Sequence, residues 1–257
     1  MKTKVYIARE YEGNASLEAF IHALPQSFEQ GGEMLWNGRN KIKSFALEDG
    51  KDIVVKSFKS LKAIQKLGYL FRDHKAHKAF VNGQELIRRG FDTPAPVACV
   101  EHYGGGLIGD AYYICLRNDM PPIEDLLCRD DWDRELATAF ARFVVSLHRQ
   151  GILHHDLNDT NVRYARNADG KYIFSLIDIN RMNFYDNMEA IPMKERIENM
   201  TRFTGRISLF EYVAREYSRA FGLDENVWTQ QAVEQKKRHD RNWYRRKRLL
   251  HPLRKRK

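Results

Sequence analysis

The stretch that decides the fold is His154-His155-Asp156-Leu157-Asn158-Asp159-Thr160-Asn161. It follows residues 132–150, where apolar side chains recur at the spacing of one face of a helix. Two strand-like runs, 162–166 and 171–177, come after it and are separated by an Asn-Ala-Asp-Gly turn. The sequence therefore predicts a polar loop, between a helix and a short hairpin, that presents a carboxylate and an amide.

The spacing of this stretch is H-x-D-L-x-x-x-N, the catalytic-loop pattern of protein kinases. In that loop the Asp accepts the proton of the acceptor hydroxyl and the Asn holds a metal ion beside the phosphates. We therefore expect Asp156 to be the catalytic base and Asn161 to be a metal ligand. An isolated H-x-D is also compatible with a turn beside a capped helix, so the assignment depends on further motifs.

Two such motifs lie in the expected order along the chain. Asp178, within Ile177-Asp178-Ile179, ends a strand and corresponds to the Asp of D-F-G, which makes it the second predicted Mg²⁺ ligand. The run Asp52-Ile53-Val54-Val55-Lys56 puts Lys56 on a strand, as in V-A-I-K, where it would contact the nucleotide phosphates. A lone strand lysine is usually solvated and a lone strand-end Asp is often a turn residue, so the prediction depends on the whole series.

The order of elements predicts an α+β chain with a bilobal, protein-kinase-like fold. We expect a β-rich, nucleotide-covering N-lobe at 1–116, a helical catalytic C-lobe at 117–235 and a basic tail at 236–257. In the N-lobe, strands are predicted at 41–47, 51–58, 97–101 and 112–116, and a mostly helical segment at 60–90. A further helical region is predicted at 193–221, with Gly222 as its cap.

One glycine motif is rejected. Gly104, Gly106 and Gly109 match G-x-G-x-x-G, but a dinucleotide site needs a helix directly after the glycines. Here a strand-like run follows, so a loose hairpin loop is the better interpretation.

Composition excludes several classes of protein. The 257 residues are 43% hydrophobic, which is too apolar for a disordered chain. No apolar run of about 18 residues exists to cross a membrane, and the N-terminus lacks the apolar stretch of a secretory signal. Three separated cysteines, Cys99, Cys115 and Cys128, favour reduced, packed thiols. We therefore expect a cytoplasmic protein.

The positive charge is concentrated at the C-terminal end. The chain carries a net charge of +9, and residues 236–257 contain 12 Lys or Arg and a single acid, Asp240. Such a run is typical of binding to a polyanion, and Trp243 and Tyr244 among the cations suit a lipid interface. We expect contact with an anionic membrane surface and no nucleic acid, although these aromatics also stack on bases and an acidic glycolipid also fits the charge. A solvated, frayed terminus is the remaining alternative.

Over residues 35–185 the chain resembles the lipopolysaccharide core kinases of the Kdo/WaaP type. The features that carry the resemblance are Asn158 in H-x-D-L-N-x-x-N, the run Ile177-Asp178-Ile179-Asn180-Arg181, and Gly90–Pro96, which reads G-x-x-T-P-x-P. The resemblance implies a kinase that uses ATP and Mg²⁺. It also implies a lipid-linked glycan as acceptor, phosphorylated on a Kdo or heptose hydroxyl of the lipopolysaccharide inner core, at the cytoplasmic face of the inner membrane.

The sequence departs from the kinase pattern at several points. Only Gly38, in Asn37-Gly38-Arg39-Asn40, stands where a glycine-rich phosphate cover is expected, so backbone amides, Arg39 or Lys41 are the alternative phosphate contacts. No A-P-E segment follows Asp178. Glu85 is the expected helix partner of Lys56, with Asn82 as the rival. Two other functions stay open: a compact atypical Ser/Thr protein kinase, and a catalytically dead kinase fold that binds a polyanion or a membrane.

Overall fold

The computed structural model describes residues 2–58, 73–187 and 189–250. Contacts divide the chain into two compact units. Unit 1 comprises Met1–Asp119 and Leu176–Arg181, and unit 2 comprises Met120–Ser175 and Met182–Lys257. The boundary predicted at 236 falls inside a continuous helix, α9 (Glu225–Leu250). In the described part of the chain no helix is long and apolar enough to span a membrane.

Unit 1 is built on one antiparallel sheet of six strands in the order β1-β5-β6-β4-β3-β2. Its strands are β1 (Lys2–Ile7), β2 (Glu33–Asn37), β3 (Lys41–Ala46), β4 (Asp52–Phe58), β5 (Pro96–Gly104) and β6 (Leu107–Leu116). The predicted β3–β4 and β5–β6 strands are confirmed. The rejected glycine motif is a hairpin turn, because Gly104 ends β5 and Gly109 lies within β6. The sequence did not predict β1 or β2.

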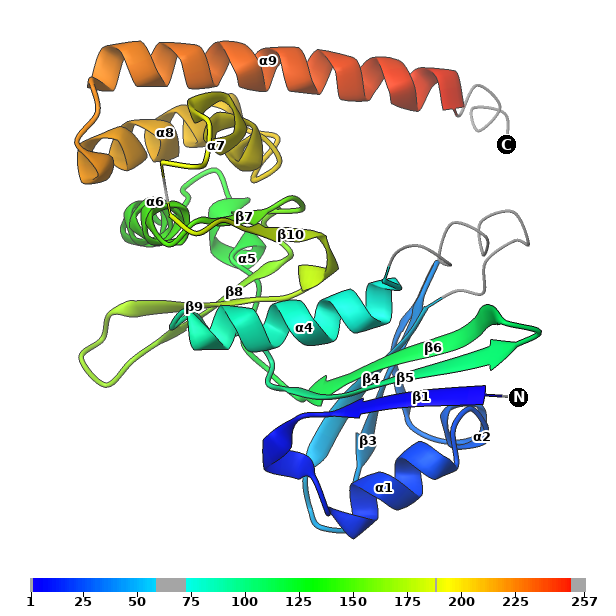
Figure 1. The fold of residues 1–257 in the computed structure, drawn as a ribbon. Coiled ribbons are helices and arrows are strands. Elements are labelled where there is room, and N and C mark those ends of the chain that lie inside the picture. Colours follow the sequence, from blue (N-terminus) through cyan, green and yellow to red (C-terminus); the bar gives the residue numbers. More distant parts are fainter. Residues whose placement is uncertain (1, 59–72, 188, 251–257) are drawn as a thin grey trace. The chain divides into compact units, whose positions relative to one another are not determined.

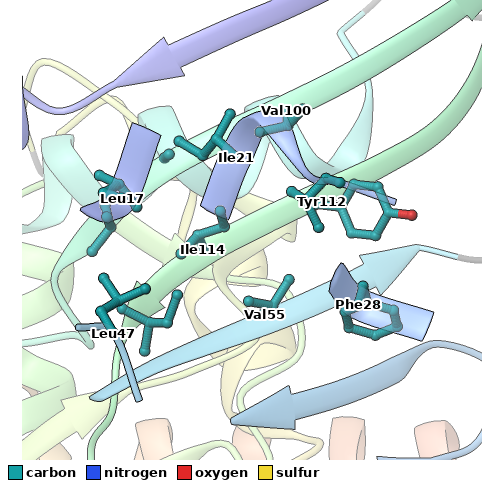
Figure 2. Packing of buried hydrophobic residues seen from close by; sticks show 12 residues of the cluster. Leu17, Ile21, Phe28, Leu47, Val55, Val100, Tyr112 and Ile114 are labelled. Carbon is teal, nitrogen blue, oxygen red and sulfur yellow. The ribbon is translucent and has the colours of Figure 1, made fainter. Parts of the chain in front are cut away.

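The helices of unit 1 lie on both faces of the sheet (Figure 1). They are α1 (Ala15–His22), α2 (Gln26–Gln30) and α4 (Lys75–Arg88). The side chains of α1 and α2, which include Leu17 and Phe28, pack on Val55 and Ile114 of the sheet in one buried cluster (Figure 2). Because successive residues of a strand point to opposite faces, Lys56 points away from this cluster. The helix predicted at 60–90 is confirmed at α4, and residues 59–72 lie outside the described residues.

Helix α4 packs closely against β5 and against η2 (Ile179–Arg181), a short 3-10 helix that directly follows Asp178. Gly83 makes this approach possible. A Cβ atom there would lie 2.5 Å from Cγ of Pro96 and 3.1 Å from Cδ1 of Ile179. On the same helix, Nδ2 of Asn82 donates to the backbone carbonyl of Ile179 at 2.7 Å. The close packing and this hydrogen bond together fix the chain just after Asp178.

Unit 2 is mainly helical and carries two small sheets. Its helices are α5 (Glu124–Leu127), α6 (Arg134–Arg149), α7 (Met193–Met200), α8 (Ile207–Phe221) and α9; its strands are β7 (Ile152–His154), paired with β10 (Met182–Phe184), and β8 (Val162–Arg166), paired with β9 (Tyr172–Leu176). Asp133 caps α6 by accepting from the backbone N of Leu136 at 2.8 Å. The region predicted at 193–221 is two helices, α7 and α8. Gly222, with φ +84°, ends the second as expected.

Candidate active site

In unit 1 the structure brings Lys56 and Asp178 together, although 122 residues separate them in sequence. The Nζ atom of Lys56 donates to Oδ1 of Asp178 at 2.5 Å, and both side chains are partly buried. Nδ2 of Asn180 donates to the same Asp178 oxygen at 2.7 Å. The pair therefore joins the strand lysine to the Ile177–Arg181 motif.

The backbone around Asp178 is tightly constrained. Asp178 has φ +55°, the left-handed region that side chains rarely adopt and that is found preferentially at functional sites. Just before it, the backbone N of Leu176 donates to the carbonyl of Asp92 at 3.0 Å. The Thr93 hydroxyl donates to the Leu176 carbonyl at 2.7 Å. The threonine of the G-x-x-T-P-x-P motif thus holds the strand that delivers Asp178.

The predicted helix partners of Lys56 are occupied elsewhere. Glu85 accepts from Arg88 at 2.6 Å and from Arg89 at 2.7 Å, and these arginines hold the pKa of its carboxyl at about 2. Asn82 binds the Ile179 carbonyl, as described above. The structure therefore brings neither Glu85 nor Asn82 to Lys56, whose ion pair is with Asp178.

A second lysine, Lys75, lies close enough to Lys56 and Asp178 to be affected by their charges, and the sequence did not predict it. Burial lowers the pKa of Lys75, and the nearby charges of Arg39 and Arg181 lower it further. The charge of Lys56 also lowers the pKa of Lys75, whereas the charge of Asp178 raises it. A site with several cations near one carboxylate is suited to a polyphosphate.

Gly38 lies in the turn between β2 and β3, the hairpin that precedes the Lys56 strand. Its backbone N donates to the carbonyl of Asn40 at 3.3 Å. A Cβ atom at this position would lie 2.4 Å from Nε1 of Trp36, whose side chain is exposed. Gly38 therefore keeps the turn narrow, and Arg39 follows it directly.

In unit 2 the loop that follows β7 contains Asp156 and Asn161, and hydrogen bonds from its own side chains fix its shape. Oδ1 of Asn158 accepts from the backbone N of Thr160 at 3.1 Å and from that of Asn161 at 2.9 Å. Nδ2 of Asn161 then donates to the carbonyl of Asp156 at 2.9 Å. This bond orients the amide so that its carbonyl oxygen is the end available as a ligand. The loop thus presents Asp156 and Asn161 in a fixed relation.

A buried chain of neutral groups supports this loop, and the sequence did not predict it. Nδ2 of Asn199 on α7 donates to the His154 carbonyl at 2.7 Å, and its Oδ1 contacts Nε2 of His148 at 3.0 Å. Nδ1 of His148 contacts the Tyr217 hydroxyl at 2.8 Å. Burial lowers the pKa of His148 to about 4, so the ring is neutral at physiological pH. Finally, Nδ1 of His154 accepts from the backbone N of Asp156 at 3.1 Å.

Asp156 opens into a cleft of about 760 Å³ within unit 2. Nη1 of Arg202 donates to its Oδ1 at 3.0 Å. Arg202, 46 residues away in sequence, carries no local motif that would have revealed this contact. The other side of the cleft is formed by α9, including Arg238, Trp243 and Arg246. Part of the predicted basic tail therefore lies in the same cleft as the predicted base.

The available donors suit a hard cation bound together with phosphates. Asp178 offers a carboxylate and Asn161 an amide oxygen, which are the ligand types that Mg²⁺ takes when substrate oxygens complete its shell. No group of three or more His, Cys, Asp or Glu side chains able to hold a metal by itself occurs among the described residues. Each unit thus offers one oxygen donor of a type that suits Mg²⁺, Asp178 in unit 1 and Asn161 in unit 2.

The model of the "Lipopolysaccharide kinase (Kdo/WaaP) family" matches residues 60–235. A solved structure of WaaP in complex with acyl carrier protein is similar, with a TM-score of 0.59 and 16% identity, covering 91% of this chain and 99% of that one. The Rio2 kinase–ADP/Mg²⁺–phosphoaspartate complex from Chaetomium thermophilum has a TM-score of 0.47 and 17% identity, covering 82% of this chain and 64% of that one. No curated protein sequence matches.

These findings confirm the kinase-like fold and the resemblance found in the sequence. The structural likeness to WaaP extends over nearly the whole of both chains and supports the fold. The family match extends over more than half of this chain and contains Asp156, Asn161 and Asp178. The chain therefore belongs to the lipopolysaccharide kinase (Kdo/WaaP) family.

Proposed function

We propose that this chain transfers the γ-phosphoryl group of Mg-ATP to a sugar hydroxyl, on Kdo or heptose, in the lipid-linked inner core of lipopolysaccharide. Family membership supports the reaction class. The observation that carries the proposal is the Lys56–Asp178 ion pair, because it joins the two motifs that hold the nucleotide phosphates and their metal in kinases.

The phosphate side of the site is assigned to unit 1. Lys56 would contact the α- and β-phosphates when nucleotide binds, and Asp178 would then become a ligand of Mg²⁺. Arg39, after Gly38, and Lys75 add positive charge near the same carboxylate. When bound, Mg²⁺ neutralises charge on the β- and γ-phosphates and helps to align them. Glu85 is not assigned a role, since Arg88 and Arg89 hold it.

The acceptor side is assigned to the loop of unit 2. Asp156 would accept a hydrogen bond from the sugar hydroxyl, orient it toward the phosphorus and take its proton as transfer proceeds. Asn161, fixed by its bond to the Asp156 carbonyl, would offer its amide oxygen to the metal. Phosphoryl transfer depends mostly on positioning and charge stabilisation, so these side chains are sufficient for most of the chemistry.

The basic residues near the C-terminus fit an enzyme that works on a membrane-bound substrate. Residues 236–248 are helical and carry cations with Trp243 and Tyr244 exposed between them. Each cation near an anionic leaflet contributes about 1 kcal/mol of binding. We propose that α9 keeps the enzyme peripherally at the inner membrane.

Incubation with radiolabelled ATP, Mg²⁺ and a panel of acceptors tests the proposal. The panel holds core-truncated lipopolysaccharides that end in Kdo or in heptose, together with a generic protein substrate. We expect label on a lipopolysaccharide core and a thermal shift with Mg-ATP. Label on protein alone would indicate the protein-kinase alternative. Absence of both label and thermal shift would indicate a catalytically dead fold.

A further inference from the structure

The cleft beside Asp156 has a composition that the phosphotransfer chemistry does not require. Its lining includes five Lys or Arg side chains and three carboxylates, and most of the cations come from α9. Its volume of about 760 Å³ lies within the range typical of sites for small organic molecules. The question is which of these charges are available to a ligand.

The carboxylates are largely compensated within the protein. Asp240 is paired with Nζ of Lys236 at 2.7 Å and contacts Nδ1 of His239 at 3.2 Å. Asp156 is paired with Arg202 at 3.0 Å. The nearly buried Lys236 is therefore committed to Asp240. Glu198, the third carboxylate of the lining, forms no ion pair with the described residues, so the five cations of the cleft face one uncompensated acid.

Two arginines on α9, Arg238 and Arg246, form no ion pair with a carboxylate among the described residues. Nη2 of Arg238 donates only to the neutral side chain of Gln235, at 3.3 Å. Arg246 makes no ion pair with the part of the chain that the structure describes. Both line the same cleft as Asp156. A planar guanidinium is the group best suited to bind a carboxylate or a phosphate through two parallel hydrogen bonds.

Aromatic rings on the same helix complete the arrangement. Trp243 and Tyr244 line the cleft and remain about half exposed or more, at 48% and 62%. Their rings contact each other edge to face at 5.0 Å. Nζ of Lys247 lies over one face of the Trp243 ring, 4.6 Å from its centroid. The exposed Tyr244 ring and the other face of Trp243 are the aromatic surfaces that can pack against the apolar face of a sugar ring. Cations and aromatics beside a hydroxyl-binding carboxylate are the combination that an acidic sugar requires.

We propose that this cleft is the acceptor subsite, and that Arg238 and Arg246 bind a carboxylate or phosphate carried by the acceptor glycan next to the hydroxyl that is phosphorylated. The proposal rests on the proposed function and specifies its substrate as an anionic glycan. It also gives α9 two roles, because cations that line the cleft recognise the acceptor and the remaining ones face a membrane.

The chain offers a matched pair of variants for the test. Arg238→Gln/Arg246→Gln removes two charges that line the cleft, whereas Arg245→Gln/Arg248→Gln removes two charges from the same helix that do not line it. The acceptor is the fully deacylated, soluble core oligosaccharide, used without vesicles so that membrane attraction plays no part. Equal thermal unfolding midpoints of the two variants establish that both are folded.

With saturating Mg-ATP, we expect the cleft variant to raise the KM for the oligosaccharide about tenfold or more and to leave kcat within about twofold. The control variant should change neither. The oligosaccharide can also be prepared with its phosphates removed and its carboxylates reduced. For this neutral acceptor the two variants should have the same KM. Equal KM changes in both variants would overturn the proposal, since they would indicate general attraction of charge.

Two further measurements separate the possible sources of failure. Calorimetric binding of the oligosaccharide, without ATP, tests the cleft independently of catalysis. Binding that the cleft variant alone weakens supports the cleft even if no transfer is observed, and only the proposed function then fails. The second measurement is binding to phosphatidylglycerol vesicles. In one outcome both variants bind the oligosaccharide equally well, and only the cleft variant loses binding to the vesicles. That result would assign the arginines to a lipid headgroup and overturn the proposal.

Discussion

The region around Lys56 and the loop around Asp156 are held in place by different physical means. In unit 1 a strand lysine and a carboxylate form a direct ion pair, and the charges of both affect a second lysine, Lys75. In unit 2 the loop is supported from below by a chain of buried, neutral hydrogen-bonding groups that includes His148 and Asn199. The comparison teaches that the first region presents charges a ligand can bind, whereas the second region holds its loop through neutral hydrogen bonds.

The largest expected effect comes from removing the charge of the first region. Asp178→Asn should lower kcat about a thousandfold or more, because the amide keeps the shape but no longer offers a charged ligand for Mg²⁺. The free energy of unfolding should change little, since the lost ion pair is partly exposed. Steady-state transfer of label and urea unfolding measure the two quantities. A loss of stability with retained activity would assign Asp178 to the fold alone.

The next effect concerns the lysine of the same pair. Lys56→Met should raise the KM for ATP and lower kcat, together by about a hundredfold or more in kcat/KM, because an apolar side chain of similar length cannot contact phosphates. Lys51→Met, in the turn before β4, is the matched control, since Lys51 forms an ion pair with Asp49 of the same turn. Equal kinetics for the two variants would remove Lys56 from the nucleotide site.

The buried hydrogen-bonding groups that support the Asp156 loop should make the stability of the protein depend on pH. The pKa of His148 falls from the ordinary value of 6.5 to about 4 on folding, so the unfolded chain binds a proton that the folded protein does not. The contribution of the neutral His148 ring to the free energy of unfolding is therefore complete above about pH 6.5. It decreases as the pH falls and is about 3 kcal/mol smaller at pH 4. His148→Gln should flatten this slope in urea unfolding between pH 7 and 4.5. An unchanged slope would show that His148 is charged in the folded protein.

The smallest effect is expected at Glu85. Glu85→Gln should leave kcat and the KM for ATP within about twofold, because its carboxylate is held by Arg88 and Arg89 on its own helix. The free energy of unfolding should fall by about 1 kcal/mol or less, as is usual for exposed pairs. Kinetics of purified protein provide the check. A loss of more than about tenfold in activity would restore Glu85 as the partner of Lys56.

Much of the fold was predictable because it follows local pattern. The alternation from Asp52 to Lys56 predicted β4, and the helical spacing before His154 predicted α6. The strands β1 and β2 were missed because they are edge strands with almost wholly exposed side chains, which leaves no alternation of buried and exposed residues. The tertiary contacts of the predicted strand β3 could not be foreseen either. Lys43 on β3 is buried, and its Nζ donates to the carbonyls of Phe28 and Gly31 at 2.6 and 2.7 Å. A buried cation of this kind cannot be read from the alternation of a strand.

The candidate site was also predictable where it follows local motifs, and not where it depends on contacts between distant segments. Motif spacing identified Lys56 and Asp178, which the structure brings together. The Glu85 assignment disregarded a local rule, because arginines at i+3 and i+4 on a helix bind such a glutamate. Arg202 and Asn199 are remote from the loop in sequence, and no motif spacing contains them. Their contacts exist only once α7 packs against the loop.

The measurement that tests the central claim most directly is transfer of label from radiolabelled ATP to the acceptor core by Asp156→Asn and Asp159→Asn. The two variants make the same chemical change in one loop, and Asp159 contacts Cys128 rather than the cleft. We predict that Asp156→Asn loses at least about a thousandfold in kcat while it still binds Mg-ATP, and that Asp159→Asn retains most of the activity. Wild-type turnover by Asp156→Asn would contradict the account.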